Sequence, residues 1–315
     1  MKYKHLFGPV VSRRLGISLG VDLIPYKYCP LNCVYCEVQR TTHLTLQRQE
    51  FFPLQEIIDE LDDALKTINH LDYITFSGAG EPTLYSRIGD IVSYIKTTYP
   101  QYKLALITNS TLLSDMNIRQ QVAPCDIVLP SLDAVSQDVF EKINRPCPGL
   151  LARELVDGLV LFRQEFIGEM WLEVFIIPHI NDHPEELYLL IDAIKSIRPD
   201  RVQINSLDRP GTEDWVTAAP QQTLEQIQKL FMKEVFCPVE IIANATYNRA
   251  AESLDDEAVE LIKSIISRRP STPEDLSTSL DLHINEVSKI LRQLHLEGII
   301  KVHREKRGVF YTWIL

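Results

Sequence analysis

Apolar and amphipathic segments alternate along most of the chain, and this alternation limits the fold more than any other feature. Short runs of β-branched and aliphatic residues are typical of buried strands, and the longer segments between them have the apolar spacing of helices. The predicted strands are Leu19–Ile24, Tyr73–Ser77, Lys103–Thr108, Ile127–Ser131, Trp171–Ile177, Arg201–Ile204 and Val239–Ile242. The predicted helices are Pro53–Leu65, Ile88–Thr97, Ser136–Ile143, Leu151–Phe166, Pro184–Ile197 and Leu224–Val235. This order predicts an α/β fold with a parallel sheet, either open or closed into a barrel.

A different pattern begins near residue 249, so we predict two domains, residues 1–248 and residues 249–315. Thr272 is a suitable N-cap for a helix because Pro273 follows it at the first helical position. The predicted elements of the second domain are the helices Leu254–Ser267, Pro273–Ser279 and Ile284–Leu296 and the strands Ile299–His303 and Val309–Ile314. Three helices followed by a hairpin resemble a winged helix-turn-helix domain.

Basic residues of this C-terminal domain are candidates for contact with nucleic acid. They lie on the third helix and in the hairpin, and they are Lys289, Arg292, Arg304, Lys306 and Arg307. Ammonium and guanidinium groups on a helix and a wing are suited to phosphates and base edges. Acidic residues such as Glu286 and Glu297 interrupt the pattern, and winged helices often contact proteins instead. The sequence leaves both kinds of partner open.

The composition narrows the class of protein further. The 315 residues are 45% hydrophobic and 24% charged, as in a globular chain, and their net charge of −11 argues against broad, nonspecific binding to nucleic acid or anionic membranes. No apolar run reaches the ~18 residues of a membrane span, and no apolar segment follows the N-terminus, so we expect neither a span nor a secretory signal. Six cysteines in such a chain predict a reducing, cytoplasmic location with thiols free to bind metal.

Three of these cysteines form one short loop, Cys29-Pro-Leu-Asn-Cys33-Val-Tyr-Cys36, directly after the first predicted strand. They form no disulfide framework, because their number is odd and the chain between them is short. Thiolates that converge suit an iron–sulfur cluster or zinc. A zinc site needs a fourth Cys or His, and the nearest candidate, His43, lies in a polar stretch. The alternatives are therefore a cluster with one open iron, a zinc-binding turn or three unrelated buried thiols.

The loop resembles that of the radical S-adenosylmethionine (SAM) superfamily, in which an aromatic residue precedes the third cysteine, as Tyr35 does here. The resemblance implies a partial (β/α)6 TIM-like barrel, to which the C-terminal winged-helix domain is added. It implies that Cys29, Cys33 and Cys36 bind a [4Fe–4S] cluster whose open iron chelates SAM. It also implies an electron donor, such as flavodoxin or ferredoxin, as a partner.

Residues that follow the predicted strands are candidates for SAM contact, because the carboxyl ends of parallel strands meet at one edge. The stretch Ser-Gly-Ala-Gly-Glu-Pro-Thr-Leu, residues 77–84, resembles the Gly-Gly-Glu segment of the superfamily, with alanine in place of its first glycine. The residues that the resemblance assigns to SAM are Tyr35, Gly78, Gly80, Glu81, Asn109, Ser131 and Asp133. Each also has a structural explanation, as part of a tight turn or as a helix cap.

Two further segments are candidates for substrate contact. Arg13 and Arg14 precede the cysteine loop, and guanidinium groups bind anions with two parallel hydrogen bonds, although a basic strand edge explains them equally well. His179 and Asn181 lie in the loop after the fifth predicted strand. Within the superfamily, residues 8–245 resemble a branch near the wyosine-type tRNA-modifying enzymes. The segments that carry this resemblance are residues 12–22, the cysteine loop, residues 77–84 and residues 209–213.

The resemblance predicts an enzyme that cleaves SAM reductively to a 5′-deoxyadenosyl radical, which then abstracts hydrogen from a substrate that the sequence does not identify. Two alternatives stay open. One is an RNA-modifying enzyme, acting on tRNA, that docks through the winged helix. The other is a non-enzymatic iron–sulfur regulator that binds DNA and senses redox state. Cys125, Cys147 and Cys237 lie far apart and are interpreted as buried or incidental thiols.

Overall fold

One eight-stranded sheet organises the chain in the computed structural model, which describes residues 3–12, 14–38, 40–68, 70–208, 211–242, 256–282, 284–305 and 308–314. The strand order is β1-β2-β5-β6-β7-β8-β9-β10. The bounds are β1 Leu6–Ser12, β2 Gly16–Val21, β5 Tyr73–Phe76, β6 Lys103–Thr108, β7 Ile127–Pro130, β8 Glu169–Phe175, β9 Arg201–Asn205 and β10 Val239–Ile241. β1 is antiparallel to β2, and the other neighbours are parallel. The fold is therefore α/β with a mostly parallel sheet, which confirms the coarse prediction.

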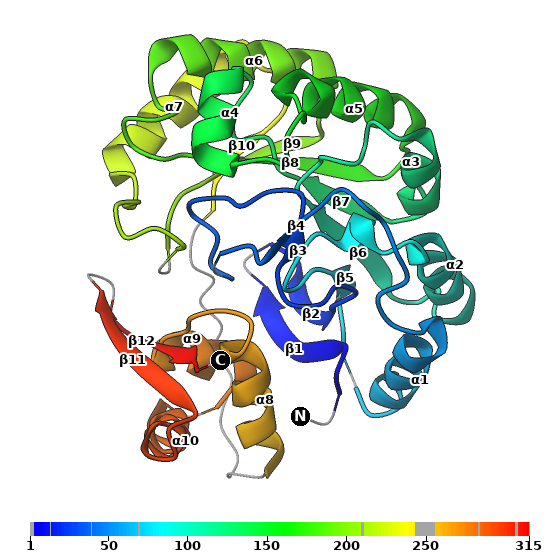
Figure 1. The fold of residues 1–315 in the computed structure, drawn as a ribbon, viewed down its shortest axis with the longest axis vertical. Helices are drawn as coiled ribbons and strands as arrows, with labels where there is room; N and C mark the ends of the chain where they lie inside the picture. The colour runs from blue at the N-terminus through cyan, green and yellow to red at the C-terminus, as the bar shows by residue number, and fades with distance from the viewer. Residues whose placement is uncertain are drawn as a thin grey trace.

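Helices connect the parallel strands and form an arc outside the sheet (Figure 1). Their bounds are α1 Leu54–Leu65, α2 Ile88–Thr98, α3 Met116–Val122, α4 Gln137–Asn144, α5 Ala152–Glu165, α6 Pro184–Ile197 and α7 Gln221–Glu234, with a short 3₁₀ helix, η1, at Pro82–Leu84. Apolar residues at helical spacing, such as Ile57 and Leu61 of α1, are fully buried against the sheet. None of the helices in the described ranges is both long and apolar enough to cross a membrane.

The parallel register brings the ends of neighbouring strands to one edge. Leu19 of β2 pairs with Ile74 of β5, and Ile74 pairs with Leu104 of β6. The segments that follow β2, β5, β6 and β7 therefore leave the sheet side by side. A two-stranded sheet, β3 (Tyr28–Cys29) with β4 (His43–Leu44), lies in the segment after β2.

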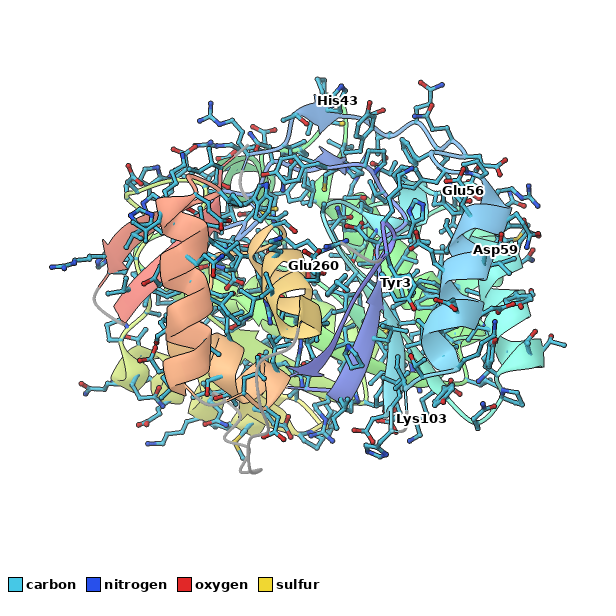
Figure 2. The ribbon with its side chains drawn as sticks, turned by 90° about the horizontal axis from the view of Figure 1, so that it is seen from below. Tyr3, His43, Glu56, Asp59, Lys103 and Glu260 are labelled. Atoms are coloured by element: carbon cyan, nitrogen blue, oxygen red, sulfur yellow. The ribbon has the colours of Figure 1, made fainter. Side chains whose placement is uncertain are left out.

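The C-terminal unit consists of α8 (Asp256–Ile266), α9 (Pro273–Leu280), α10 (Ile284–Leu296) and the antiparallel strands β11 (Ile300–Glu305) and β12 (Gly308–Trp313). Its core contains Ile262, Leu276 and Leu291, and Val10 of β1 belongs to the same core. On the other side of β1, the amide of His5 donates to Glu60 of α1 at 2.7 Å. β1 thus lies between the C-terminal unit and α1, the helix that carries Glu56 and Asp59 in Figure 2.

Besides the short elements β3, β4 and η1, the elements β1 and α3 were not predicted from the sequence. β1 has a mixed sequence, Leu-Phe-Gly-Pro-Val-Val-Ser, and it acquires its partners only through β2 and the C-terminal unit. α3 is short and mostly polar, and it begins where the Asp115 side chain accepts a hydrogen bond from the amide of Asn117 at 2.8 Å. Tertiary contact rather than apolar spacing defines both elements.

Candidate active site

The three predicted cluster ligands lie in one loop at the carboxyl end of β2. Cys29 ends β3, and Cys33 and Cys36 follow it in the loop. The end of α4 holds this loop in place, because the amide of Asn32 donates to the carbonyl oxygen of Asn144 at 2.8 Å. The three thiols thus lie in one loop, and a hydrogen bond to the end of α4 fixes the backbone of that loop.

Each of the three thiols accepts one hydrogen bond from a side-chain nitrogen. The pairs are Asn109 Nδ2 with Cys29 Sγ at 3.3 Å, Asn144 Nδ2 with Cys33 Sγ at 3.3 Å, and Lys27 Nζ with Cys36 Sγ at 3.1 Å. Hydrogen bonds of this kind favour a thiolate over a thiol. Lys27 is buried, which by itself lowers its pKa, but Cys36 and the other two thiols raise the pKa overall. The surroundings therefore supply one donor for each sulfur.

This donor set fits an iron–sulfur cluster. Burial raises the pKa of Cys29 to about 12 and the pKa of Cys33 well above its usual range, so these sulfurs need a positive centre to stay deprotonated. Among the residues that the structure describes, no group of three Cys, His, Asp or Glu side chains is arranged around a single metal ion. A four-iron cluster does not require the three sulfurs to surround a single ion, because each thiolate binds its own iron.

The Gly78–Gly80 loop, which follows β5, lies directly against the segment that leads into the cysteine loop. Gly78 has a φ of +154°, and a Cβ on it would lie 2.2 Å from Cγ of Asp22. A Cβ on Gly80 would lie 2.1 Å from the carbonyl oxygen of Tyr28. Asp22 also accepts a hydrogen bond from the amide of Ala79 at 3.2 Å. Glycine is needed at both positions because the two loops are in contact.

Glu81 links this loop to the end of β6. Its carboxylate accepts hydrogen bonds from the Thr83 hydroxyl at 2.6 Å, the Thr108 hydroxyl at 2.7 Å and the Asn109 amide at 2.8 Å. Burial raises the pKa of Glu81, and these donors oppose that shift. The side chain thus fixes Asn109 beside Cys29, and the predicted contact of Glu81 with SAM stays a prediction.

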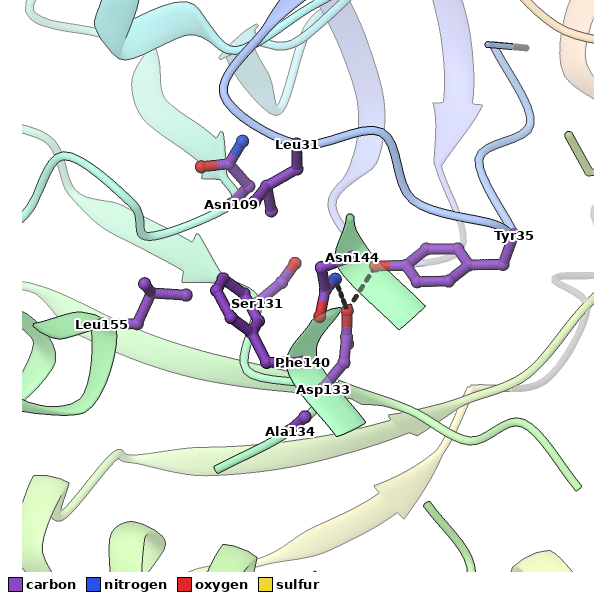
Figure 3. A pocket seen from close by; sticks show the side chains of 9 residues that line it. All are labelled: Leu31, Tyr35, Asn109, Ser131, Asp133, Ala134, Phe140, Asn144 and Leu155. Atoms are coloured by element: carbon purple, nitrogen blue, oxygen red, sulfur yellow. Dashed lines mark hydrogen bonds between the residues drawn. The ribbon is translucent and has the colours of Figure 1, made fainter. Parts of the chain in front are cut away.

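Four other predicted SAM residues, Tyr35, Asn109, Ser131 and Asp133, line one small cavity beside the cysteine loop (Figure 3). Its volume is about 10 Å³, which is room for one water molecule. The Tyr35 hydroxyl donates to Asp133 Oδ2 at 2.5 Å, and Asn144 Nδ2 donates to the same oxygen at 2.8 Å. Burial raises the pKa of Asp133 to about 6, although these two donors lower it. Asp133 therefore joins the cysteine loop to β7 and α4.

A larger cavity, of about 640 Å³, lies between the sheet and the C-terminal unit. Tyr35, Cys36 and Gly78 line it, as do residues of α8 and α9. The ring of Tyr35 stacks on Phe175, with the two centroids 3.9 Å apart. This volume lies within the range of small-molecule sites, and the cavity borders both the cysteine loop and the Gly78–Gly80 loop.

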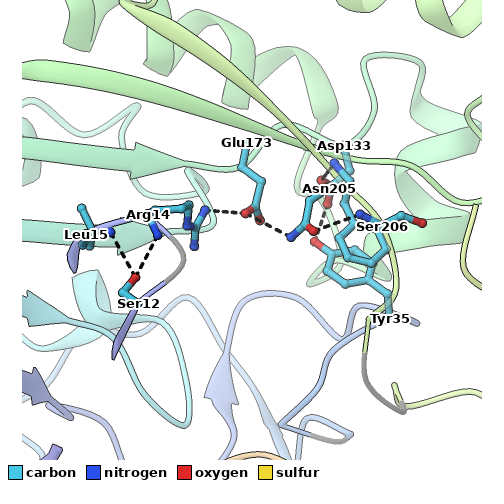
Figure 4. A network of polar contacts seen from close by, with 9 residues as sticks. Ser12, Arg14, Leu15, Tyr35, Asp133, Glu173, Asn205 and Ser206 are labelled. Atoms are coloured by element: carbon cyan, nitrogen blue, oxygen red, sulfur yellow. Dashed lines mark hydrogen bonds and ion pairs between the residues drawn. The ribbon is translucent and has the colours of Figure 1, made fainter. Parts of the chain in front are cut away.

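A polar network crosses the wall of this cavity (Figure 4). Arg14 Nη1 donates to Glu173 Oε2 at 2.5 Å, and Asn205 Nδ2 approaches the same oxygen at 3.4 Å. Arg14 follows β1, whereas Glu173 and Asn205 belong to β8 and β9. The structure thus places Arg14, a predicted substrate residue, in the cavity with a carboxylate as its partner.

The other predicted substrate residues lie elsewhere. Asn181 is fully buried, and its amide group binds backbone atoms, including the carbonyl oxygen of Phe175 at 2.7 Å. His179 is exposed, and its amide donates to Asp182 at 2.7 Å. Neither residue lines the larger cavity. Arg13 lies outside the described residues.

The predicted nucleic-acid contacts are described only in part. Arg304 is exposed on β11. The side chains of Lys289 and Arg292 lie outside the described part of the structure, as do Lys306 and Arg307.

The residues of the site that sequence reasoning missed include Lys27, Asn144, Asp22 and Glu173. Asp22 could have been predicted, because it is a polar residue directly after a strand, like Asn109. For Lys27, the sequence feature that points to the site is its position two residues before Cys29. Asn144 reaches Cys33 across 111 residues of chain, so the fold alone brings it there.

An α/β fold with three cysteines in a loop after the second strand, next to a glycine-containing loop, defines a protein that binds a metal cluster and a small cosubstrate. The sequence pattern of the radical SAM superfamily matches residues 23–191. A UPF0026 protein of Helicobacter pylori is 31% identical over 280 residues, which are 88% of each chain. The chain belongs to the radical SAM superfamily and, within it, groups with the UPF0026 proteins. It is therefore an enzyme of that superfamily, whose cofactors are a [4Fe–4S] cluster and SAM.

Two further relatives set the limits of the comparison. A Brachyspira hyodysenteriae protein named GTPase Obg is 36% identical over 303 residues, but these are 96% of this chain and only 44% of that protein. The crystal structure of Streptococcus suis SuiB bound to S-adenosylmethionine has a TM-score of 0.53 and 14% identity, covering 72% of this chain and 51% of that one. The chain thus spans about half the length of these two proteins, and the SuiB likeness shows the fold alone.

Proposed function

We propose that the chain cleaves SAM reductively and directs the resulting radical at a small substrate in the 640 Å³ cavity. The observation that carries the proposal is the convergence of three elements. Cys36 of the cysteine loop and Gly78 of the predicted SAM loop line the same cavity, and the side-chain network around Arg14 completes its wall. A cavity of this size has room for a small substrate next to the atoms that react.

In this proposal Cys29, Cys33 and Cys36 hold the cluster, and Tyr35, Gly78, Gly80, Glu81, Asn109, Ser131 and Asp133 surround SAM. When bound, the cluster supplies the electron that splits SAM into methionine and the 5′-deoxyadenosyl radical. Lys27, Asn109 and Asn144 orient the three sulfurs, and Lys27 also places a positive charge beside Cys36. Glu81 fixes the end of β6, and Asp133 fixes the ring of Tyr35.

We further propose that the sheet and its helices form a partial (β/α)6 barrel over residues 1–248, and that residues 249–315 form a winged-helix domain. Supporting observations are the parallel order from β2 to β10 and the three helices followed by a hairpin. The electron donor, the relation to the wyosine-type enzymes and the nucleic-acid partner stay predictions.

The decisive experiment starts from protein reconstituted anaerobically with iron and sulfide. After dithionite and SAM are added, 5′-deoxyadenosine is quantified by chromatography. The wild-type chain and a Cys237→Ala variant, which lacks a half-buried thiol far from the loop in sequence, should form it. The Cys33→Ala variant should not. A well-formed cluster that never yields 5′-deoxyadenosine would overturn the proposal and favour a redox-responsive regulator.

A further inference from the structure

The C-terminal unit forms part of the wall of the candidate active site. Ile265 of α8, Arg268 and Arg269 after it, and Thr278 of α9 line the larger cavity opposite the sheet. The same unit includes Val10 of β1 in its apolar core. The unit is therefore packed against the sheet through buried side chains and also faces the reaction space.

Arg268 makes the most direct connection between the two parts of the chain. Its side chain is 12% exposed, and its Nε lies 3.5 Å from Oδ2 of Asp22, which is 10% exposed. The guanidinium carbon lies 4.9 Å above the ring of Phe7 in β1. Nη1 donates to the carbonyl oxygen of Ser264 at 3.0 Å, so the side chain is anchored on the last turn of α8.

Asp22 continues the connection to the predicted SAM loop. Its carboxylate accepts hydrogen bonds from the amide of Ala79 at 3.3 and 3.2 Å and from the amide of Ile24 at 3.4 Å. Gly78 approaches the same carboxylate so closely that a Cβ there would lie 2.3 Å from Oδ1. One buried carboxylate thus holds the Gly78–Gly80 loop and faces the cation of the C-terminal unit.

We propose that Arg268 is a positioning residue that couples the docking of the C-terminal unit to the conformation of the Gly78–Gly80 loop. The inference rests on the proposed function, because it takes this loop to be part of the SAM site. Arg268 touches Asp22 rather than SAM, and it acts by keeping the Asp22 carboxylate charged and in place.

The physical reason is the cost of a buried charge without a partner. Burial already raises the pKa of Asp22 to about 6, although Arg268 and the two backbone amides lower it. Removal of the guanidinium leaves a carboxylate that must either take up a proton or turn toward water. Either response weakens its hydrogen bond to the amide of Ala79, so the loop loses its anchor.

The test measures amide hydrogen exchange of the full-length chain by mass spectrometry, without SAM. In Arg268→Met, peptides covering residues 77–84 should exchange about tenfold faster than in the wild type, an effect of the size expected between groups in contact. Arg163→Met is the matched control, because it removes a partly buried ion pair, with Asp200 at 2.9 Å, on another part of the molecule. Peptides from β6 report any general loss of stability.

The double variant Asp22→Asn/Arg268→Met distinguishes coupling through Asp22 from simple loosening. Asparagine still accepts from the amide of Ala79 but needs no cation, so exchange should return to within about twofold of the wild type. Exchange in Arg268→Met that equals the wild type would overturn the proposal. Equal loosening in the single and double variants would overturn it as well.

A second readout is the dissociation constant for SAM of the reconstituted full-length protein. We expect it to rise about tenfold in Arg268→Met and to recover in the double variant. An unchanged constant in Arg268→Met would overturn the link to the SAM site. If the wild type binds no SAM while the exchange results hold, the proposed function fails and the coupling between the two parts stands.

Discussion

At the scale of single residues, the candidate site is defined by what surrounds each sulfur. Lys27, Asn109 and Asn144 give one nitrogen donor to each of the three thiols, and Lys27 also brings a positive charge to Cys36. Donors and charges near the sulfurs set how readily an iron–sulfur cluster accepts an electron.

We predict that Lys27→Met lowers the reduction potential of the reconstituted cluster by about 60 mV or more, which is tenfold in a one-electron equilibrium. The reason is that the reduced cluster loses a hydrogen bond and a neighbouring positive charge. A redox titration followed by electron paramagnetic resonance gives the potential. Lys195→Met serves as the control, because Lys195 pairs with Glu234 on the helical side of the molecule. Equal potentials in the two variants would contradict the assigned role of Lys27.

Gly80 gives a second prediction for a single residue. A Cβ there would meet the carbonyl oxygen of Tyr28 at 2.1 Å and a methyl carbon of Ile24 at 2.6 Å, and backbone cannot give way as a flexible side chain does. Gly80→Ala should therefore lower the free energy of unfolding by about 1–3 kcal/mol and reduce the iron bound after reconstitution.

Gly89→Ala provides the comparison for urea unfolding and iron analysis. Gly89 lies inside α2, and a Cβ there would meet Cγ of Gln121 at 2.8 Å and Cβ of Gln121 at 3.1 Å, so Gln121 must shift. Since alanine favours a helix by up to about 1 kcal/mol over glycine, part of this cost is offset, and the variant should lose less stability than Gly80→Ala and bind iron as the wild type does. Similar losses in both glycine variants would mean that the close approach at Gly80 is not the cause.

At the scale of elements, α6 supports the segment that carries Asp133 into α4. Glu186 in the first turn of α6 is 1% exposed, and its carboxylate accepts from the amide of Val135 at 2.5 Å, the amide of Ser136 at 3.1 Å and the Ser136 hydroxyl. These amides stand at the start of α4, where a helix has no partners of its own for its first N–H groups. The far end of α4 carries Asn144, so Glu186 supports the site from outside it.

Glu186→Ala should lower the free energy of unfolding by about 1–3 kcal/mol, because it leaves two partly buried amides without an acceptor. Glu185→Ala, one residue earlier, removes a side chain that is 82% exposed and should change stability by less than about 0.5 kcal/mol. Urea unfolding of both variants measures the difference. An equal, small effect would show that α4 does not depend on α6 for its first turn.

The elements also show which parts of the structure the sequence predicts. Lys103–Thr108, Pro184–Ile197 and Ile284–Leu296 match β6, α6 and α10 residue for residue, because an apolar run or a regular apolar stripe decides each of them. β2 begins three residues before its predicted start and ends at Val21, because Asp22 turns away to bind the Gly78–Gly80 loop. β1 and α3 depend on partners distant in sequence, and no local pattern indicates them.

At the scale of the whole molecule, the C-terminal unit uses different surfaces for different contacts. α8 and α9 face the sheet, whereas Lys301, His303 and Arg304 of β11 are exposed. Arg304, the predicted nucleic-acid contact whose side chain is described, therefore lies on a surface separate from the cavity wall.

We expect Arg304→Glu to weaken binding of a short structured RNA equally for different sequences and to reduce the slope of log K against log salt by about one. The physical reason is the loss of one phosphate contact on a chain with a net charge of −11. Fluorescence anisotropy over a range of salt concentrations measures this, with Arg163→Glu as the control. Wild-type protein that shows no salt-dependent binding would contradict the predicted nucleic-acid contact.

The same scale shows why the candidate site was only partly predictable. The cysteine spacing and the polar residues after strands led to Cys29, Gly78, Asn109 and Asp133, because local sequence marks both features. Glu173 and Arg268 could not be predicted, because each looks like an ordinary surface residue until the fold turns it toward the cavity.

The shared core of Val10 with Ile262, Leu276 and Leu291 also bears on the order in which the protein matures. β1 is an edge strand, and residues of the C-terminal unit, which begins with α8, cover it. During synthesis the sheet is therefore complete while its cavity still lacks one wall, and an unprotected strand edge is exposed meanwhile. Until that unit packs, the cavity beside Cys36 stays open on that side.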